Sequence, residues 1–210
     1  ALVVPAVAQD AQPGQGGLII EGNFGGDPEN LNPIIASSTT SSRIINLIFP
    51  GFIGVDPATA LFEKNRPDAL VTDWTISEDG KTYTFTLRRN ARFQDGTDIS
   101  AEDVAFSLTR ALDPATTDGD ASQLAAPTFL SDIVGARELL SGEADTLAGV
   151  AVLDDLTLQI QLTQPRSTFL MRLATGPASV IDPRDLDKGD DWWSDPNGSG
   201  PFRVDKFDIA

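Results

Sequence analysis

Apolar and polar side chains alternate strictly in the middle of the chain, and this alternation predicts a pair of antiparallel strands. Tyr83, Phe85 and Leu87 alternate with threonines, so the apolar side chains share one face of a strand. Asp79-Gly80 precedes this strand, and Asp-Gly is a strong signal for a tight turn between two strands. The pattern therefore predicts a β-hairpin over residues 71–89, with Phe85 and its apolar neighbours facing the core.

A second alternation predicts another hairpin over residues 150–162. Leucine or isoleucine occupies every second position from Leu156 to Leu162, with threonine and glutamines between them. Asp154-Asp155 comes just before this run, and we expect these two residues to form the turn.

Between the two hairpins the period of the apolar positions becomes helical. Apolar residues recur at helical spacing from Val104 to Leu112, directly after Ser100, which is a favoured N-cap residue. Ser100 with Asp103 resembles a capping box, although the usual partner is Glu or Gln. The Asp-Pro pair that ends at Pro114 should stop this helix.

The shorter apolar segments predict the remaining elements. We expect a strand at Leu18–Ile20, a helix at Arg43–Phe49 after the polar run Ser37–Ser42, a loop at 115–126, helices at 128–141 and 167–174, and a turn at Gly198–Pro201 that leads into a strand at Phe202–Phe207. The apolar residues of the helix at Arg43–Phe49 cover most of its circumference, so we expect this helix to be buried on all sides. Hairpins separated by helices indicate α+β layering for residues 53–177.

Composition excludes several kinds of site. The chain of 210 residues contains 31 acidic and 15 basic side chains, so its net charge is 15 − 31 = −16. Such a surface repels nucleic acids and anionic membranes, and no apolar run approaches the length of a membrane span. The absence of Cys and His excludes a cysteine nucleophile, a Ser-His-Asp triad and a Cys/His zinc site. We expect no nucleic acid partner, no direct membrane insertion, no metal and no cofactor.

The first sixteen residues have the composition of a processed leader. The run Ala1–Ala8 is apolar and ends in small residues, and Gln9–Gly16 is polar and rich in turn formers. This pattern predicts a signal-peptide remnant cleaved near Ala8, followed by a flexible start, over residues 1–16. The alternative is a disordered alanine-rich start. On the first interpretation the protein is exported to the periplasm.

Several motifs together resemble one protein family. The segment from Trp74 to Gly96 reads WTISEDGKTYTFTLRRNARFQDG, and it continues as TDISAEDVAFSLTRALDP to Pro114. This sequence resembles the signature region of the family 5 extracellular solute-binding proteins, the peptide- and nickel-binding receptors of ATP-driven (ABC) importers. Two further matches are Leu31-Asn32-Pro33, where the family usually has Leu-Asp-Pro, and Gly198–Phe202, close to its Gly-Thr-Gly-Pro-Tyr.

The resemblance implies a fold of mixed α/β and α+β type. Such receptors have two α/β lobes around a cleft and an extra domain on the first lobe, and they are normally much longer than this chain. By this analogy residues 17–52 and 178–210 form the discontinuous first lobe, and residues 53–177 form the inserted extra domain. The second lobe is absent from the sequence, which is therefore expected to be an amino-terminal fragment or a shortened protein.

The resemblance also implies a function and a ligand site. The expected function is capture of a small-molecule or peptide ligand by a monomer that delivers it to the membrane permease of an ABC importer. In this family the loop after the Leu-x-Pro motif contributes to the cleft, and the matching hydroxyl residues here are Ser38, Thr39, Thr40 and Ser41. They precede a helix whose backbone N–H groups could meet a ligand carboxylate. The alternative is an ordinary helix cap with a polar loop.

A second candidate loop contains Thr117 and Asp118, which could face the cleft from the extra domain. A solvated loop is the favoured alternative. The same loop faintly resembles a calcium loop, but it lacks the twelve-residue spacing and the terminal Glu.

Two other functions remain open from the sequence. One is a non-transport interaction module that uses only this lobe. The other is a carboxylate-based hydrolase. This function is less favoured, because Asp154-Asp155 and Asp190-Asp191 are sequence neighbours in turns and make poor acid–base pairs. Trp192-Trp193 suggests an aromatic platform for a ligand, although such a pair more often packs over the edge of a core.

Overall fold

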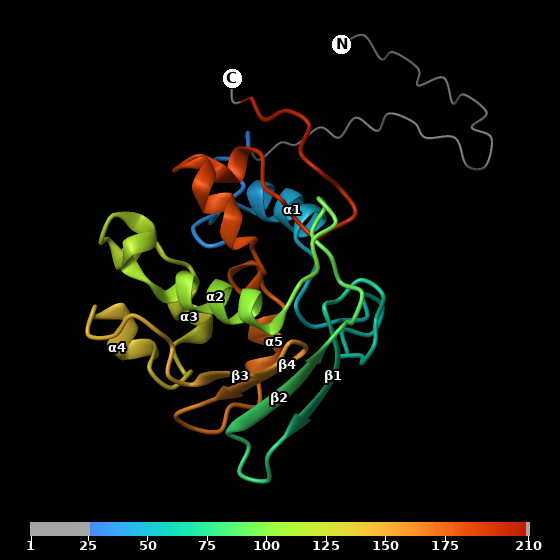
Figure 1. Cartoon of the computed structure of the whole chain (residues 1–210), viewed down its shortest axis with the longest axis vertical. Coiled ribbons are helices and arrows are strands. Elements are labelled where there is room, and N and C mark those ends of the chain that lie inside the picture. Colours follow the sequence, from blue (N-terminus) through green and yellow to red (C-terminus); the bar gives the residue numbers. More distant parts are fainter. Residues whose placement is uncertain (1–25, 209–210) are drawn as a thin grey trace, which may run out of the picture.

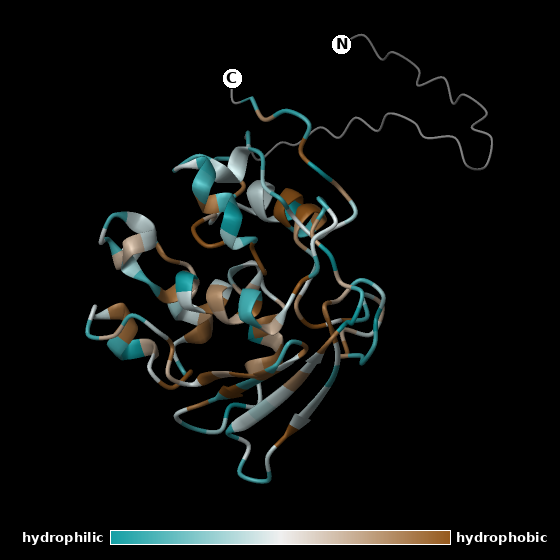
Figure 2. Ribbon diagram, in the orientation of Figure 1, coloured by the Kyte–Doolittle hydropathy of each residue, from teal (hydrophilic) through white to brown (hydrophobic). Residues whose placement is uncertain are grey.

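The computed structural model describes residues 26–208, and a four-stranded antiparallel sheet forms one side of the fold (Figure 1). Its strands are β1 (Val71–Ile76), β2 (Thr82–Leu87), β3 (Val150–Asp154) and β4 (Thr157–Gln161), in the order β1-β2-β4-β3. Both predicted hairpins are confirmed, and their inner strands β2 and β4 pair with each other. The hydrophilic turn that joins β1 and β2 projects away from the helices (Figure 2).

The alternation of side chains along β2 sets the register of the sheet. Tyr83 pairs with Ile160 and Phe85 pairs with Leu158, and all four side chains are buried on the face that the helices cover. The threonines of β2 lie on the other face, where they are exposed or half-buried. The predicted orientation of Phe85 is therefore confirmed.

The helices are α1 (Thr39–Ile48), α2 (Ala101–Leu112), α3 (Pro127–Leu130), α4 (Ala136–Leu140) and α5 (Phe169–Leu173). Short 3-10 helices occupy Pro114–Thr117, Ala121–Gln123, Gly176–Ala178, Pro183–Lys188 and Trp192–Ser194. Figure 1 shows α1 beside the segment that leads to the C-terminus, at the opposite end of the molecule from the β1–β2 turn. Within the described part of the chain, no helix is long and apolar enough to cross a bilayer.

The start of α2 confirms the predicted capping box. The Ser100 hydroxyl accepts a hydrogen bond from the Asp103 N–H, and the Asp103 carboxylate accepts one from the Ser100 N–H at 2.8 Å. The apolar face of the helix is buried against the sheet through Val104 and Leu108. The helix ends before Pro114, as expected.

One predicted helix is two helices in the structure. The segment 128–141 is broken between α3 and α4, where Gly135 has a φ of +87°. A Cβ at Gly135 would lie 2.7 Å from the backbone nitrogen of Ala148, so this position needs glycine. Val134 also donates to the Gln161 carbonyl at the end of β4. Pairing with the sheet thus overrides the local helical pattern.

Other predictions need smaller corrections. Residues 202–207 do not form a strand; Phe202 instead donates its N–H to the Leu47 carbonyl of α1. The predicted loop at 115–126 contains two 3-10 turns, and the helix predicted at 167–174 is the five-residue α5. The predicted strand at Leu18–Ile20 and the leader at 1–16 lie outside the described residues.

Candidate functional site

The four hydroxyl residues predicted as a loop form the cap and first turn of α1. Ser38 is the N-cap residue, and its side-chain oxygen accepts a hydrogen bond from the Ser41 N–H at 3.1 Å. The Ser38 carbonyl accepts both the N–H and the hydroxyl of Ser42, at 3.0 and 2.9 Å. The helix was expected at Arg43–Phe49, and it begins already at Thr39 because these polar side chains satisfy its first turn.

Burial separates the four residues from one another. Ser41 is fully buried, and Thr40 has only 8% of its surface exposed. The Ser41 hydroxyl oxygen also accepts a hydrogen bond from the Ser38 hydroxyl at 3.0 Å, so this group is used inside the protein. Ser38 is half-buried and Thr39 is exposed. Thr39 is therefore the side chain of this turn that a bound molecule would meet first.

The first turn of α1 has no acidic side chain. The start of a helix carries a partial positive charge because its first N–H groups lack acceptors within the helix. The chain as a whole has a net charge of −16, but the first turn of this helix contains no carboxylate. The start of α1 is therefore a suitable place for an anionic group. A carboxylate that approached Thr39 would meet both a hydroxyl and this positive end.

The segment before α1 holds the helix in place. The Asn32 side chain is 5% exposed, and its oxygen accepts the Ile34 N–H at 3.0 Å. The Asn32 carbonyl also accepts the Ala36 N–H at 2.9 Å. Leu31 and Ile34 are buried on either side. This tight turn fixes the entry of the chain into α1, and asparagine supplies the side-chain oxygen that makes the turn.

The prediction that α1 is buried on all sides was wrong. Ile45 and Ile48 are buried, but Asn46 is exposed and Leu47 is 44% exposed. The helix therefore packs through one face, and its opposite face is open in the described part of the chain.

The second predicted loop is largely self-contained. The Thr117 hydroxyl is buried and donates to the Asp120 carbonyl at 2.7 Å and to the Pro114 carbonyl at 3.2 Å. Asp118 is exposed and adopts a left-handed conformation, with a φ of 52°, that ends the 3-10 helix. These bonds give Thr117 a structural role and leave Asp118 as the residue of this loop that faces solvent.

A backbone hydrogen bond joins residues next to the two predicted segments. The Ala125 N–H donates to the Ile34 carbonyl at 3.2 Å, which joins the end of the 115–126 segment to the turn before α1. None of the six predicted site residues lines the large cavity described next.

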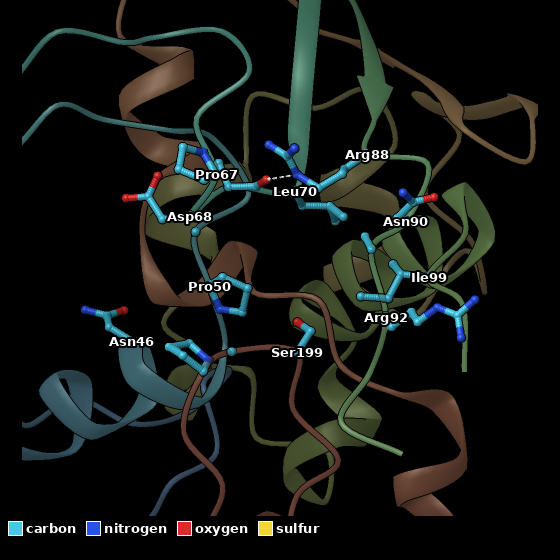
Figure 3. A pocket seen from close by; sticks show the side chains of 15 residues that line it. Asn46, Pro50, Pro67, Asp68, Leu70, Arg88, Asn90, Arg92, Ile99 and Ser199 are labelled. Atoms are coloured by element: carbon cyan, nitrogen blue, oxygen red, sulfur yellow. Dashed lines mark hydrogen bonds between the residues drawn. The ribbon is translucent and has the colours of Figure 1, made fainter. Parts of the chain in front are cut away.

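A cavity of about 730 Å³ lies between the C-terminal end of α1, the end of β2 and the turn at residues 199–201 (Figure 3). Its volume falls within the range of small-molecule sites, roughly 300–1,000 Å³. Arg88 and Arg92 lie on its wall, but Arg88 donates to the carbonyls of Ala69 and Arg66, and Arg92 pairs with Asp98 at 3.1 Å. Its other polar side chains include those of Asn46, Asn90 and Ser199.

Sequence reasoning missed this cavity. Four stretches of the chain, at residues 46–51, 67–70, 88–92 and 199–201, form it together with Ile99, and nothing in the period of their side chains predicts that they meet. The available signals were Arg88, which directly follows β2, and the Gly198–Pro201 turn; in the sequence alone they indicate the end of a hairpin and a turn before a strand.

Two buried carboxylates are bound by the protein itself. Asp182 is 2% exposed; burial opposes its ionisation, but hydrogen bonds from Arg184 and Asn197 hold its pKa below the ordinary value. Burial raises the pKa of Asp185, which pairs with Lys188 at 2.9 Å and accepts the Asn197 N–H at 2.7 Å. These contacts make the two groups structural counterions.

Two further predictions concern metals and aromatic residues. No group of three or more acidic, His or Cys side chains among residues 26–208 is arranged to hold a metal ion. Trp192 is buried in the core, and the Trp193 ring lies edge-on to Phe207 at 5.5 Å. Packing over the core edge, the more common role of such a pair, accounts for both tryptophans.

Comparison with known proteins gives a consistent match. Residues 67–209 match the model of the bacterial extracellular solute-binding proteins, family 5. The glutathione-binding protein GsiB of Escherichia coli is 32% identical over 178 residues, which are 84% of this chain and 30% of the relative. The probable deoxycholate-binding periplasmic protein YgiS of Escherichia coli is 31% identical over 185 residues, which are 86% of this chain and 33% of the relative.

The fold is similar to that of solved binding proteins. A periplasmic oligopeptide-binding protein of an ABC transporter from Borrelia burgdorferi, OppAIV, superimposes with a TM-score of 0.76 and 30% sequence identity. The match covers 89% of this chain and 36% of that protein. The chain thus spans about a third of the length of the proteins that it matches. The names of these relatives describe binding proteins rather than enzymes.

Proposed function

Because the chain belongs to the bacterial extracellular solute-binding proteins of family 5, we propose that it is part of a periplasmic receptor for a small ligand. The receptor captures the ligand outside the cytoplasm and delivers it to the membrane permease of an ABC importer. Its action is binding and not catalysis. The family match over residues 67–209 and the similarity in fold to an oligopeptide-binding protein of an ABC transporter support this proposal.

The proposed architecture has two lobes that close on the ligand. Residues 17–52 and 178–210 belong to the first lobe, and residues 53–177 form the extra domain. In support, the whole four-stranded sheet lies between Val71 and Gln161, and α1 contacts the distant segment 199–202 through backbone hydrogen bonds. A ligand that bridges two lobes stabilises the closed form and shifts the hinge equilibrium toward it.

The proposed ligand carries a carboxylate. The matched relatives are named for glutathione, deoxycholate and oligopeptides, and each of these molecules has at least one carboxylate group. The observation that carries this assignment is the first turn of α1, which is capped by Ser38, lacks acidic side chains and exposes Thr39. The ligand carboxylate approaches this turn and interacts with the positive end of the helix and with the Thr39 hydroxyl.

A bulky substitution tests the proposal. In the full chain of the receptor, Thr39→Trp should reduce affinity on the order of a hundredfold for whichever of glutathione, trialanine and deoxycholate the wild type binds in calorimetry. The melting temperature should change little, because Thr39 is exposed. Leu61→Trp is the matched control, since Leu61 is 64% exposed and lies in a loop outside the proposed site.

The outcomes separate the site from the scaffold. Equal affinity in wild type and Thr39→Trp would place the ligand elsewhere, with the cavity at Asn90 as the next candidate. A large fall in melting temperature would mean that the turn is packed structure. Failure of all three probes to bind the wild-type protein would contradict the proposed ligand class.

A further inference from the structure

The C-terminal end of α1 is capped by a segment 150 residues further along the chain. The Ile48 carbonyl accepts the N–H groups of Ser199 and Gly200 at 3.1 and 2.7 Å, and the Leu47 carbonyl accepts that of Phe202 at 3.3 Å. The last carbonyls of a helix have no partner within the helix. The Gly-Ser-Gly-Pro-Phe segment therefore supplies the donors that close α1.

Two glycines of this segment allow the close approach. A Cβ at Gly198 would lie 2.4 Å from the Ile48 carbonyl oxygen, and one at Gly200 would lie 2.3 Å from that of Leu47. These oxygens belong to the backbone of α1 and cannot move independently of the helix. An alanine at Gly200 would force either α1 or the segment to shift.

One side chain holds the capping segment against α1. The Gln94 amide nitrogen donates to the Gly200 carbonyl at 3.1 Å and to the Phe202 carbonyl at 2.6 Å. The Gln94 backbone N–H also donates to the Gly198 carbonyl at 2.8 Å. Among the described residues, the Gln94 side-chain oxygen is buried without a hydrogen-bond partner. The two bonds of its amide nitrogen are therefore the polar contacts that this side chain contributes.

The turn that carries Gln94 is itself anchored. Asp95 accepts a hydrogen bond from Arg184 at 2.8 Å, and its N–H donates to the Asn197 side chain at 3.1 Å. Asn197 in turn donates to the buried Asp182 at 2.6 Å. The capping segment is thus also tied, through Asn197, to the buried Asp182.

We propose that Gln94 is a positioning residue for the ligand, acting through the Gly198–Phe202 segment and α1. The proposal rests on the function proposed above, because the ligand turn lies at the other end of this helix. The turn at Asn32 fixes where the chain enters α1, whereas packing through one face, at Ile45 and Ile48, is non-directional and does not by itself hold the other end of the helix. The backbone bonds to Leu47 and Ile48 are directional, and they fix the position of α1 along its axis. Its ten residues extend roughly 15 Å, so a shift at one end moves Thr39 at the other.

The test uses two variants of the full chain of the receptor, each with a matched control. Gln94→Met keeps the length of the side chain and removes both donors, and Gln159→Met removes one hydrogen bond, to Thr84, on the sheet. Gly200→Ala introduces the clash, and Gly176→Ala adds a methyl group whose nearest neighbour is 3.9 Å away. The measurements are amide hydrogen exchange, resolved by segment, and calorimetry with glutathione and trialanine.

The two test variants should increase exchange of the α1 amides on the order of tenfold and leave β2 and β4 unchanged. Affinity for the peptide probe should fall on the order of tenfold, and the two controls should behave as wild type. Unchanged exchange in α1 would overturn the proposal, and so would faster exchange with unchanged affinity. If the wild type bound neither probe, the proposed function would fail for peptides, whereas the exchange measurement would still decide whether Gln94 holds α1.

Discussion

The two longest helices among residues 26–208 begin in opposite ways, although serine caps both of them. At the start of α2, Ser100 and Asp103 exchange two hydrogen bonds, and Glu102 and Asp103 add negative charge to the first turn. The Ala101 N–H also donates to the Asp155 carbonyl at 2.8 Å. At the start of α1, Ser38 caps the Ser41 N–H and no acidic residue follows.

This difference separates a structural helix start from one that is available to a ligand. The protein itself supplies the negative charge and most of the acceptors at the start of α2, so an added anion would gain little there. The positive end of α1 has no acid in its first turn, and Thr39 is exposed beside it. Sequence similarity identified the family through the motif that contains α2, whereas the proposed ligand turn lies at α1.

The largest effect on stability is expected at the segment that supports both helices. Ile181 donates its N–H to the Ser107 hydroxyl of α2 at 3.0 Å, and the adjacent Asp182 binds Asn197 beside the segment that caps α1. Asp182→Asn should lower the free energy of unfolding by about 2 kcal/mol at pH 7. This loss is smaller than that expected on breaking a fully buried ion pair, because its partner Arg184 is exposed to solvent.

Acid titration checks the same variant. The pKa of Asp182 is lowered in the folded protein, so its contribution is present above the unfolded value of roughly 3.9 and is lost as the pH falls through the folded value. The difference in stability between wild type and Asp182→Asn in urea melts should therefore shrink as the pH falls below the unfolded pKa. A difference that stayed constant into acid would contradict the assigned role of this carboxylate.

The next effect concerns the start of α2 alone. Ser100→Ala removes the capping box and should cost about 1–2 kcal/mol in urea melts. Ligand affinity should remain that of the wild type, since this helix start is completed by the protein. If Ser100→Ala lost affinity and Thr39→Trp did not, the start of α2, and not that of α1, would be the one that contacts the ligand.

The matched change at α1 should have a smaller effect on stability and a larger effect on binding. Ser38→Ala removes the cap on the Ser41 N–H and should cost about 0.5–1 kcal/mol. Affinity for the proposed carboxylate ligand should fall severalfold, because the cap shapes the turn that is proposed to contact it. Binding equal to that of wild type, measured by calorimetry beside Ser100→Ala, would count against a ligand at this turn.

The sequence predicted the elements whose signals are local. Period-two alternation with Asp79-Gly80 was sufficient for the first hairpin, and Ser100 with Asp103 for the start of α2. These signals depend on residues only a few positions apart. The family resemblance was confirmed for the same reason, since its motifs are short and occur in order.

Predictions that depended on distant contacts were wrong or incomplete. Helix 128–141 breaks because Gly135 lies against Ala148, and the predicted strand after Pro201 is replaced by a cap on α1. The cavity beside Asn90 combines four stretches of the chain that no local pattern connects. The assignment of Ser38–Ser41 and of Thr117 and Asp118 to a ligand site remains a prediction, for which Thr39 and Asp118 are the exposed positions.

Giving α1 the negative charge that α2 already has tests whether the start of α1 receives the ligand carboxylate. Thr39→Glu places a carboxylate in the first turn of α1, which should leave stability unchanged or raise it by about 0.3–1 kcal/mol. The added charge repels a ligand carboxylate, so affinity should fall on the order of a hundredfold. Thr128→Glu, at an exposed threonine near the start of α3, is the matched control and should bind as wild type.

Calorimetry and melting curves of these two variants, with the carboxylate probe that the wild type binds, decide the matter. The Thr39→Glu protein should be at least as stable as wild type and bind the ligand far more weakly. A Thr39→Glu protein that binds with wild-type affinity would contradict the claim that the start of α1 receives the ligand carboxylate.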